Sequence, residues 1–171
     1  MNTLDAMRSR RNVRQFADRP IPSKDLDQVL EMARRTPSAS NQQKWDFVVV
    51  TDRKQLQELA KVWQGAGHIA GSAATIALVA PKESDEHARE LVQYDLGQAT
   101  MTIMLAAADL GIGTGHAYAQ DQKQAQKVLG FPDGQVLAWL VALGYPADGP
   151  LKPINELKRR PFDEVVHRCR W

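Results

Sequence analysis

The sequence predicts an α+β fold of three layers, in which a central sheet is covered by helices on its faces. Compact apolar runs at residues 46–51, 74–80 and 136–143 have the length and composition of buried strands. Segments with helical spacing alternate with these runs, and the longest covers residues 84–110. Helices that alternate with buried strands are typical of a layered fold.

The first half of the chain is predicted to begin with two helices. Residues 3–9 have helical spacing, and a second helix begins at Ser23 as its N-cap and ends at Pro37. The apolar stripe of this second helix consists of Leu26, Val29, Leu30 and Ala33. The later elements of this half are a strand at 46–51, a helix at about 53–63 and a strand at 74–80.

The second half is predicted to be organised around one long helix at residues 84–110. Its first half is charged and its second half is apolar and small, so we expect it to run through the centre of the molecule. A turn that continues as a strand follows at 111–118, and a helix at 122–129 is closed by Gly130. The last predicted strand lies at 136–143.

The tail from Pro150 onward is rich in proline and basic residues. It then carries a short strand-like run, DEVVH, and ends in Trp171. A segment this extended cannot bury its own apolar side chains. We therefore expect it to lie against another surface, such as the sheet of a partner in a dimer.

Composition and charge narrow the function classes. The 171 residues, 43% hydrophobic and 25% charged, are typical of one soluble globular domain, and the net charge of +2 does not favour general binding to nucleic acid. The single cysteine, Cys169, excludes a disulfide framework within the chain and a cysteine-based metal cluster. Asp5 and Arg8 interrupt the N-terminal region where a signal peptide would be apolar, and residues 99–110 are too short to span a bilayer. We expect a cytoplasmic protein without a membrane partner.

The N-terminal segment RSRRNVRQF concentrates positive charge. It contains Arg8, Arg10, Arg11 and Arg14. Guanidinium groups suit phosphate oxygens, and the end of a helix adds backbone groups to such a site. The alternative from the residues alone is a solvated basic face. A second basic cluster, Lys158, Arg159 and Arg160, comes near the C-terminus.

The segment TPSASNQQKWDF, residues 36–47, is a second candidate site. It connects a helix to a buried strand, where binding loops are common. Its short neutral donors and acceptors suit the edge of a polar heterocycle better than a phosphate. The alternative is a polar connector with Asn41 in a left-handed turn and Trp45 in the core.

The glycine series LGIGTG resembles a dinucleotide fingerprint but fails its requirements. Position 116 is histidine, the motif follows a helix instead of a first strand, and no ribose-binding acid follows at the expected place. The glycines still allow a flat ligand or a neighbouring backbone to come close. His68, His87, His116 and His167 show no metal-ligand spacing. Since no nucleophile or acid–base pair is visible either, an enzyme of this sequence would have to use a cofactor.

Five segments together resemble the nitroreductase family of flavin enzymes. They are RSRRNVRQF, PSASNQQKWDFVVV, LGIGTG, LGYPADGP and KRRPFDEVVH, in the family's order and over essentially the whole chain. The resemblance implies an FMN-binding homodimer with a mixed, mainly antiparallel central sheet. It also implies two active sites at the subunit interface and an exchanged C-terminal segment that embraces the partner.

The resemblance also implies roles for individual residues. The FMN phosphate and ribityl group would be held by Arg10, Arg11, Asn12 and Arg14, and from the other end of the chain by Arg159 and Arg160, with Lys158 as an alternative. The flavin would be contacted from the other subunit by Pro37, Ser38, Ala39, Asn41 and Gln43. The stretch from Gly115 to Ala119 would pass the flavin edge, where the Tyr118 amide would reach N5. Because reduced FMN is anionic around N1 and O2, a cationic or amide donor there would stabilise it, and His68 and Lys44 are the candidates from the residues.

The chain departs from the family pattern at three points. Lys44 stands where many relatives have proline, Asn12 replaces a frequent serine, and the long helical insertion that often roofs the substrate channel is missing. The implied function is a ping-pong oxidoreductase that uses NAD(P)H to reduce nitroaromatics, quinones or related electrophiles. The alternatives are a non-catalytic flavin-binding or storage protein and, from the arginine clusters, a nucleic-acid-binding module.

Overall fold

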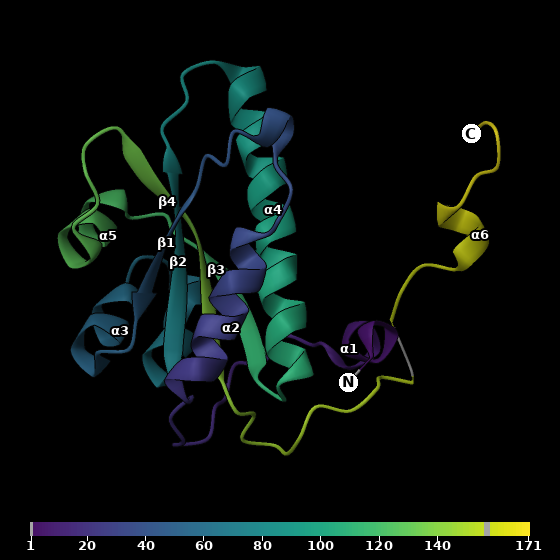
Figure 1. Cartoon of the computed structure of the whole chain (residues 1–171), viewed down its shortest axis with the longest axis horizontal. Helices are drawn as coiled ribbons and strands as arrows, with labels where there is room; N and C mark the ends of the chain where they lie inside the picture. Colours follow the sequence, from purple (N-terminus) through teal and green to yellow (C-terminus); the bar gives the residue numbers. More distant parts are fainter. Residues whose placement is uncertain (1, 156–157) are drawn as a thin grey trace.

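A four-stranded antiparallel sheet forms the centre of the computed structural model, which describes residues 2–155 and 158–171 (Figure 1). Its strand order is β1-β2-β4-β3. The strands are β1 (Asp46–Val50), β2 (Ala74–Pro81), β3 (Gly113–Tyr118) and β4 (Gln135–Gly144).

The expectation of a mixed sheet is wrong for the strands described, because all three strand pairs are antiparallel. The reason lies in the connections. Residues 51–73 connect β1 to β2, and residues 119–134 connect β3 to β4. Each connection begins and ends at the same end of the sheet, which makes the two strands it joins antiparallel. The connection from β2 to β3 is a long crossover, because β4 lies between these two strands in the sheet. An isolated bridge from Asn12 to Thr114 is parallel.

Helices cover both faces of this sheet, as predicted for three layers (Figure 1). The side chains of β2 alternate between the faces. Ile76 and Leu78 pack toward α2 (Ser23–Arg34) and α4 (Glu86–Asp109). Ala77 and Val79 pack in the other cluster, with α3 (Arg53–Leu59) and α5 (Gln122–Leu129).

The long helix α4 is the longest element beside the sheet. Asp85 caps it by accepting a hydrogen bond from the Ala88 amide at 2.8 Å. Leu96 and Ile103 are completely buried, so the predicted central position is confirmed. Among the described helices, none combines the length and hydropathy needed to cross a membrane.

Several helix boundaries differ from the prediction: α2 ends at Arg34, before Pro37, and α4 spans Glu86–Asp109 within the predicted 84–110. Ser23 is the first residue of α2 and not its cap; Pro22 takes the cap position, and no side chain caps this end. The helix predicted for 53–63 ends at Leu59, and a 3₁₀ helix, η2 (Gln64–Gly71), follows. Its three glycines disfavour an α-helix, and η2 places His68 near β3.

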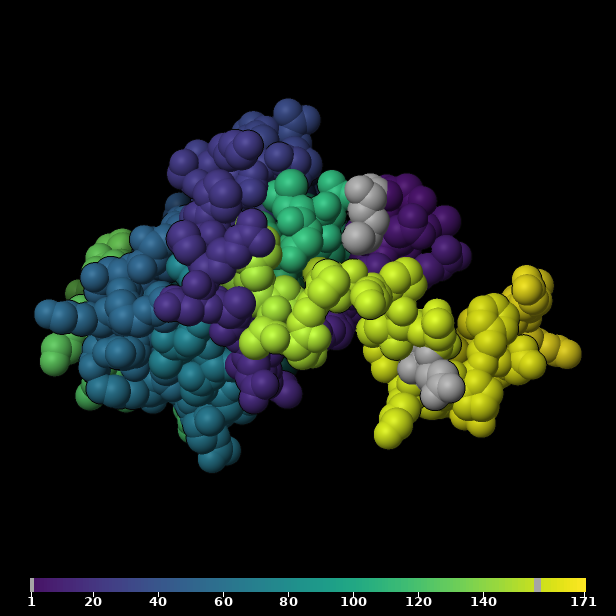
Figure 2. All heavy atoms as spheres, turned by 90° about the horizontal axis from the view of Figure 1, so that it is seen from below, coloured from purple at the N-terminus to yellow at the C-terminus, as the bar shows by residue number. Residues whose placement is uncertain are grey.

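The end of the tail, residues 158–171, lies apart from the body of the molecule (Figures 1 and 2). Its beginning does not, because Leu151 is buried with Val13 and Ala108, and the Ile154 amide donates to the Arg8 carbonyl at 3.0 Å. The predicted strand within DEVVH is wrong: Phe162–Val165 form a short helix, α6. No sheet edge is beside it, and Arg160 donates a hydrogen bond to the Glu164 carbonyl across the turn at 2.8 Å. Residues 158–171 are all exposed, Trp171 to 99%.

Candidate functional site

The arginine segment lies against the edge strand β3. Its first two residues, Arg8 and Ser9, end α1 (Thr3–Ser9), whose C-cap is Arg10. The Val13 amide donates to the Thr114 carbonyl at 2.8 Å, and the Val13 side chain is buried with Ala108. The segment is thus fixed at the sheet, and it is not a detached basic tail.

The glycine series serves this contact. A Cβ atom at Gly115 would overlap the Val13 carbonyl oxygen, and one at Gly113 would lie 2.7 Å from Val13 Cγ2. Of the two uses expected for these glycines, the close approach of a neighbouring backbone is therefore confirmed.

The predicted phosphate-binding arginines divide into two sets. Arg10 and Arg14 act electrostatically on His116, and Arg14 also acts on His68. Arg11 instead forms an ion pair with Asp148. Arg10 and Arg14 are therefore the better phosphate candidates, because the charge of Arg11 is already balanced.

Two histidines complete a basic cluster. The Nε2 atom of His68 lies 3.2 Å from the Gly115 carbonyl oxygen, to which it donates in its neutral form. Partial burial lowers the pKa of His68 and that of His116, and the nearby arginines lower both further. In this cluster of Arg10, Arg14, His68 and His116, the two arginines supply the positive charge and the lowered pKa values favour neutral histidines. The arginines therefore favour an anionic ligand.

An aromatic hollow of about 500 Å³ adjoins this basic cluster. It is lined by Arg14, Trp63, Gly65, His116, Ala117, Tyr118 and Trp139. The Tyr118 ring lies 5.8 Å from that of Trp139 and 6.3 Å from that of Trp63, centroid to centroid. A hollow with aromatic walls beside a positively charged cluster fits a flat ring that carries a phosphate.

The loop with the second set of predicted residues has an unusual backbone. Three non-glycine residues adopt left-handed conformations, with φ of 49° at Ser40, 55° at Asn41 and 51° at Gln43. Such conformations persist only where their surroundings enforce them, and they often occur at functional sites. The Ser38 hydroxyl accepts a hydrogen bond from the Gln43 amide at 2.9 Å. The left-handed Asn41 expected for a polar connector is confirmed, and Trp45, expected in the core, is partly buried against it.

Lys44 fastens the end of this loop. Its Nζ atom lies 2.7 Å from Glu83 Oε1. The residue that replaces a proline of many relatives thus adds an ion pair, which also reduces the positive charge it could offer to a flavin.

The two halves of the predicted site do not meet within one chain. The loop contacts α4 at Asp95 and the arginine segment contacts it at Ala108, about 20 Å further along the helix axis. Figure 1 shows the turn near residue 40 beside the upper end of α4 and α1 beside its lower end.

Arg159 and Arg160 lie in the exposed end of the tail, which projects from the body of the molecule (Figure 2). Arg159 donates to the Lys158 carbonyl at 2.8 Å, and Arg160 contacts Glu164. The part of the chain that the structure describes therefore does not join the two basic clusters.

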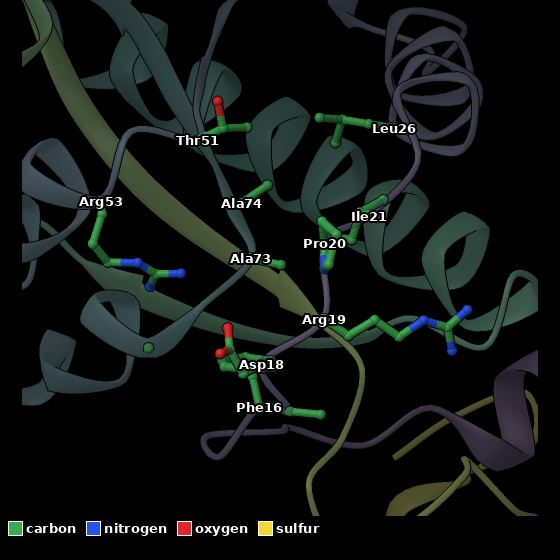
Figure 3. A pocket seen from close by; sticks show the side chains of 12 residues that line it. Phe16, Asp18, Arg19, Pro20, Ile21, Leu26, Thr51, Arg53, Ala73 and Ala74 are labelled. Carbon is green, nitrogen blue, oxygen red and sulfur yellow. The ribbon is translucent and has the colours of Figure 1, made fainter.

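A second hollow, of about 510 Å³, is formed mainly by residues 16–21, 51–53 and 71–74 (Figure 3). Its arginines have structural partners. Arg53 donates to the carbonyls of Ala70 and Ser72 at 2.7 and 3.0 Å, and the Arg19 guanidinium lies 3.8 Å from the centroid of the Tyr145 ring. None of the predicted site residues lines this hollow.

The sequence analysis did not identify three residues that form the hollow or hold the loop. Trp63 and Trp139 wall the aromatic hollow, and buried Asp95 holds the loop. Only Asp95 left a signal, as an acid beside Leu96 in a helix that becomes apolar. Within residues 2–155 and 158–171, no three His, Cys, Asp or Glu side chains gather as a metal site would require.

Known proteins are similar to this chain in sequence and in fold. The model of the nitroreductase family matches residues 7–67 and 61–145. A protein of Archaeoglobus fulgidus, provisionally named NADH dehydrogenase/NAD(P)H nitroreductase, is 31% identical over 98% of both chains. A nitroreductase family protein from Clostridium novyi has a TM-score of 0.79 at 28% identity, covering 86% of this chain and 87% of its own. An FMN-dependent nitroreductase from Clostridium difficile has a TM-score of 0.84 at 23% identity, covering 98% and 99%.

Proposed function

Because the chain belongs to the nitroreductase family of oxidoreductases, we propose that it binds FMN and uses NAD(P)H to reduce small electrophilic molecules in a ping-pong reaction. The observation that carries this proposal is the basic cluster beside the aromatic hollow on β3. When bound, FMN would supply the chemistry, because it accepts a hydride from NAD(P)H and passes it to a second substrate.

The residues of the basic cluster fit the phosphate end of FMN. Arg10 and Arg14 carry permanent charge, and the fixed contact of Val13 with Thr114 holds their backbone in place. Asn12 and Arg11 lie in the same segment, and Arg159 and Arg160 would approach from the tail. Their contribution requires a rearrangement of the tail or its exchange with a partner.

The aromatic hollow fits the ring end. Tyr118 and Trp139 present flat surfaces, and His68 is held beside β3 by its hydrogen bond to the Gly115 carbonyl. As in the family, the stretch from Gly115 to Ala119 would pass the ring edge, with the Tyr118 amide at N5. Since protons reach an open hollow from solvent, no side chain is assigned as an obligatory proton donor.

The separation of the two halves supports a homodimer. The loop residues Pro37, Ser38, Ala39, Asn41 and Gln43 would then contact the flavin of the partner subunit. Exposed apolar side chains offer a surface for this contact, including Tyr94 and Met101 on α4 and Met7 on α1. Phe162 and Trp171 of the tail would be buried by the same association.

Nitroaromatics, quinones and related electrophiles are the proposed substrate class. The aromatic walls of the hollow favour flat acceptors that stack on a flavin. The family name of the relatives supports nitro reduction as the first activity to measure.

An absorbance spectrum of the purified protein, followed by anaerobic titration with NADH and with NADPH, tests the proposal. We expect bound flavin that loses its colour with at least one nicotinamide and regains it with a nitroaromatic or quinone. Bound flavin that neither nicotinamide bleaches would indicate a flavin-binding or storage protein. Absence of flavin after reconstitution, with salt-dependent binding to DNA, would indicate the nucleic-acid-binding alternative.

A further inference from the structure

Asp95 is a buried carboxylate that contacts the left-handed loop. It lies on α4 with 5% of its surface exposed. Its two oxygens accept a bifurcated hydrogen bond from the Ala39 amide, at 3.0 and 3.2 Å. Gln98 Nε2 lies 3.5 Å from one of these oxygens.

This contact caps the 3₁₀ helix η1 (Ala39–Asn41). The residue at its N-cap, Ser38, makes no capping bond with its side chain, because its hydroxyl instead accepts from the Gln43 amide. Asp95 supplies the missing acceptor from another element, 56 positions further along the chain. A carboxyl oxygen is a suitable acceptor at this position because the first amides of a helix have no acceptor within it.

The loop depends on such external contacts. Its three left-handed residues cost free energy, so local preference alone would not select this conformation. Asp95 fixes its beginning at Ala39, and the ion pair of Lys44 with Glu83 fixes its end. The Asp95 contact is the more deeply buried of the two, and solvent screens it less.

We propose that Asp95 is a positioning residue that holds Ser38–Gln43 in the conformation that receives the flavin. The identity of the ligand, FMN, rests on the proposed function. The effect of Asp95 on the loop does not depend on that function. Asp95 acts through the Ala39 amide and does not itself contact the cofactor.

The effect on the loop is measured on the protein without flavin by amide hydrogen exchange. In Asp95→Ala, we expect exchange at Ala39 and its neighbours up to Gln43 to accelerate by about 10-fold or more, because a charge-assisted hydrogen bond is lost. Asp95→Asn keeps an acceptor oxygen in the same place and should restore most of the protection. Asp95→Ser, which is too short to reach Ala39, replaces the alanine variant if that variant does not fold.

Leu96→Ala is the matched control, because Leu96 is the next residue of α4 and is completely buried in the core. It should lower the melting temperature and leave exchange in the loop unchanged relative to the rest of the protein. Equal acceleration in the loop for Leu96→Ala and Asp95→Ala would show a general loss of stability and overturn the proposal. Unchanged exchange in Asp95→Ala would also overturn it.

The effect on the ligand is measured by titration with FMN. We expect the dissociation constant to rise about 10-fold or more in Asp95→Ala and to stay within about 3-fold of the unmodified protein in Asp95→Asn and Leu96→Ala. A looser loop with unchanged FMN affinity would overturn the positioning role. If the unmodified protein binds no FMN, the proposed function fails, and the exchange experiment still decides whether Asp95 holds the loop.

Discussion

The Val13 carbonyl oxygen lies so close to Gly115 that a Cβ atom at position 115 would clash with it. This relationship couples the arginine segment to β3, because Val13 lies between the arginines and donates its amide to Thr114. It explains why glycine stands at position 115 in terms of packing between two backbones.

Gly115→Ala is therefore expected to push the arginine segment away from β3. The overlap involves main-chain atoms, which cannot rotate away as a flexible side chain can. We expect a loss of about 1–3 kcal/mol in the free energy of unfolding, together with weaker FMN binding. Gly67→Ala is the control, since a Cβ at Gly67 would meet nothing within 4 Å. Thermal denaturation of both variants measures the difference, and equal stability would contradict the packing argument.

Arg14→Ala should release FMN more readily than Arg11→Ala. Arg14 lies in the basic cluster, whereas Arg11 forms an ion pair with Asp148. We expect the FMN dissociation constant to rise at least about 10-fold for Arg14→Ala, as for the loss of a charge-assisted phosphate contact. Fluorescence titration of FMN gives both constants. Arg34→Ala, which removes an exposed partner of Glu31 on α2, serves as the control for loss of a positive charge.

Arg159→Ala extends this test to the tail. If its guanidinium reaches the phosphate, this variant should retain less FMN, as Arg14→Ala does, while it keeps its fold. Unchanged flavin content in both Arg14→Ala and Arg159→Ala would contradict the whole phosphate assignment.

The sequence predicted the regular elements well because their signals are local. The buried runs of β2 and β4 and the amphipathic α5 with Gly130 were all found near their observed bounds. The glycine-rich η2 and the helix in the tail were missed, because short segments of this kind take their conformation from what lies beside them. The hydrogen bond between Asp95 and the Ala39 amide could not be predicted from a local pattern, because 56 positions separate the two residues.

The sequence predicted which segments would contribute to the site, but it did not predict how one chain arranges them. The resemblance to the family located the arginine segment, the loop and β3, but one chain holds the loop and the arginines about 20 Å apart along α4. The aromatic walls depend on the pairing of β3 with β4, which sets Tyr118 opposite Trp139. That register is a property of the sheet and is not visible in either strand alone.

The stability of the protein without flavin should fall as the pH is lowered below about 6.5. Burial lowers the pKa of His68 and of His116 in the folded state, so the unfolded state binds protons more readily. Both histidines contribute full stability above the usual histidine pKa near 6.5, and the contribution is lost as the pH falls from there toward the lowered values. Melting temperatures between about pH 5 and 8 measure this slope.

The double variant His68→Gln, His116→Gln tests the origin of that slope. It should flatten the dependence between about pH 5 and 6.5. His87→Gln is the control, because His87 is exposed at the start of α4, outside the basic cluster. An unchanged slope in the double variant would assign the acid sensitivity to other groups.

Removal of residues 158–171 should separate association from folding. These residues are exposed in the chain, so their loss should leave the melting temperature of the body nearly unchanged at protein concentrations where it is monomeric. If the tail embraces a partner, light scattering should show a dimer for the full chain and a monomer for the shortened one. FMN binding should weaken with it, since the loop of the partner and the tail arginines would both be lost from the site. The variant Arg159→Ala, Arg160→Ala is the control, because it should keep the dimer and weaken only the binding of FMN. A shortened chain that still forms a dimer would contradict the exchange of the tail.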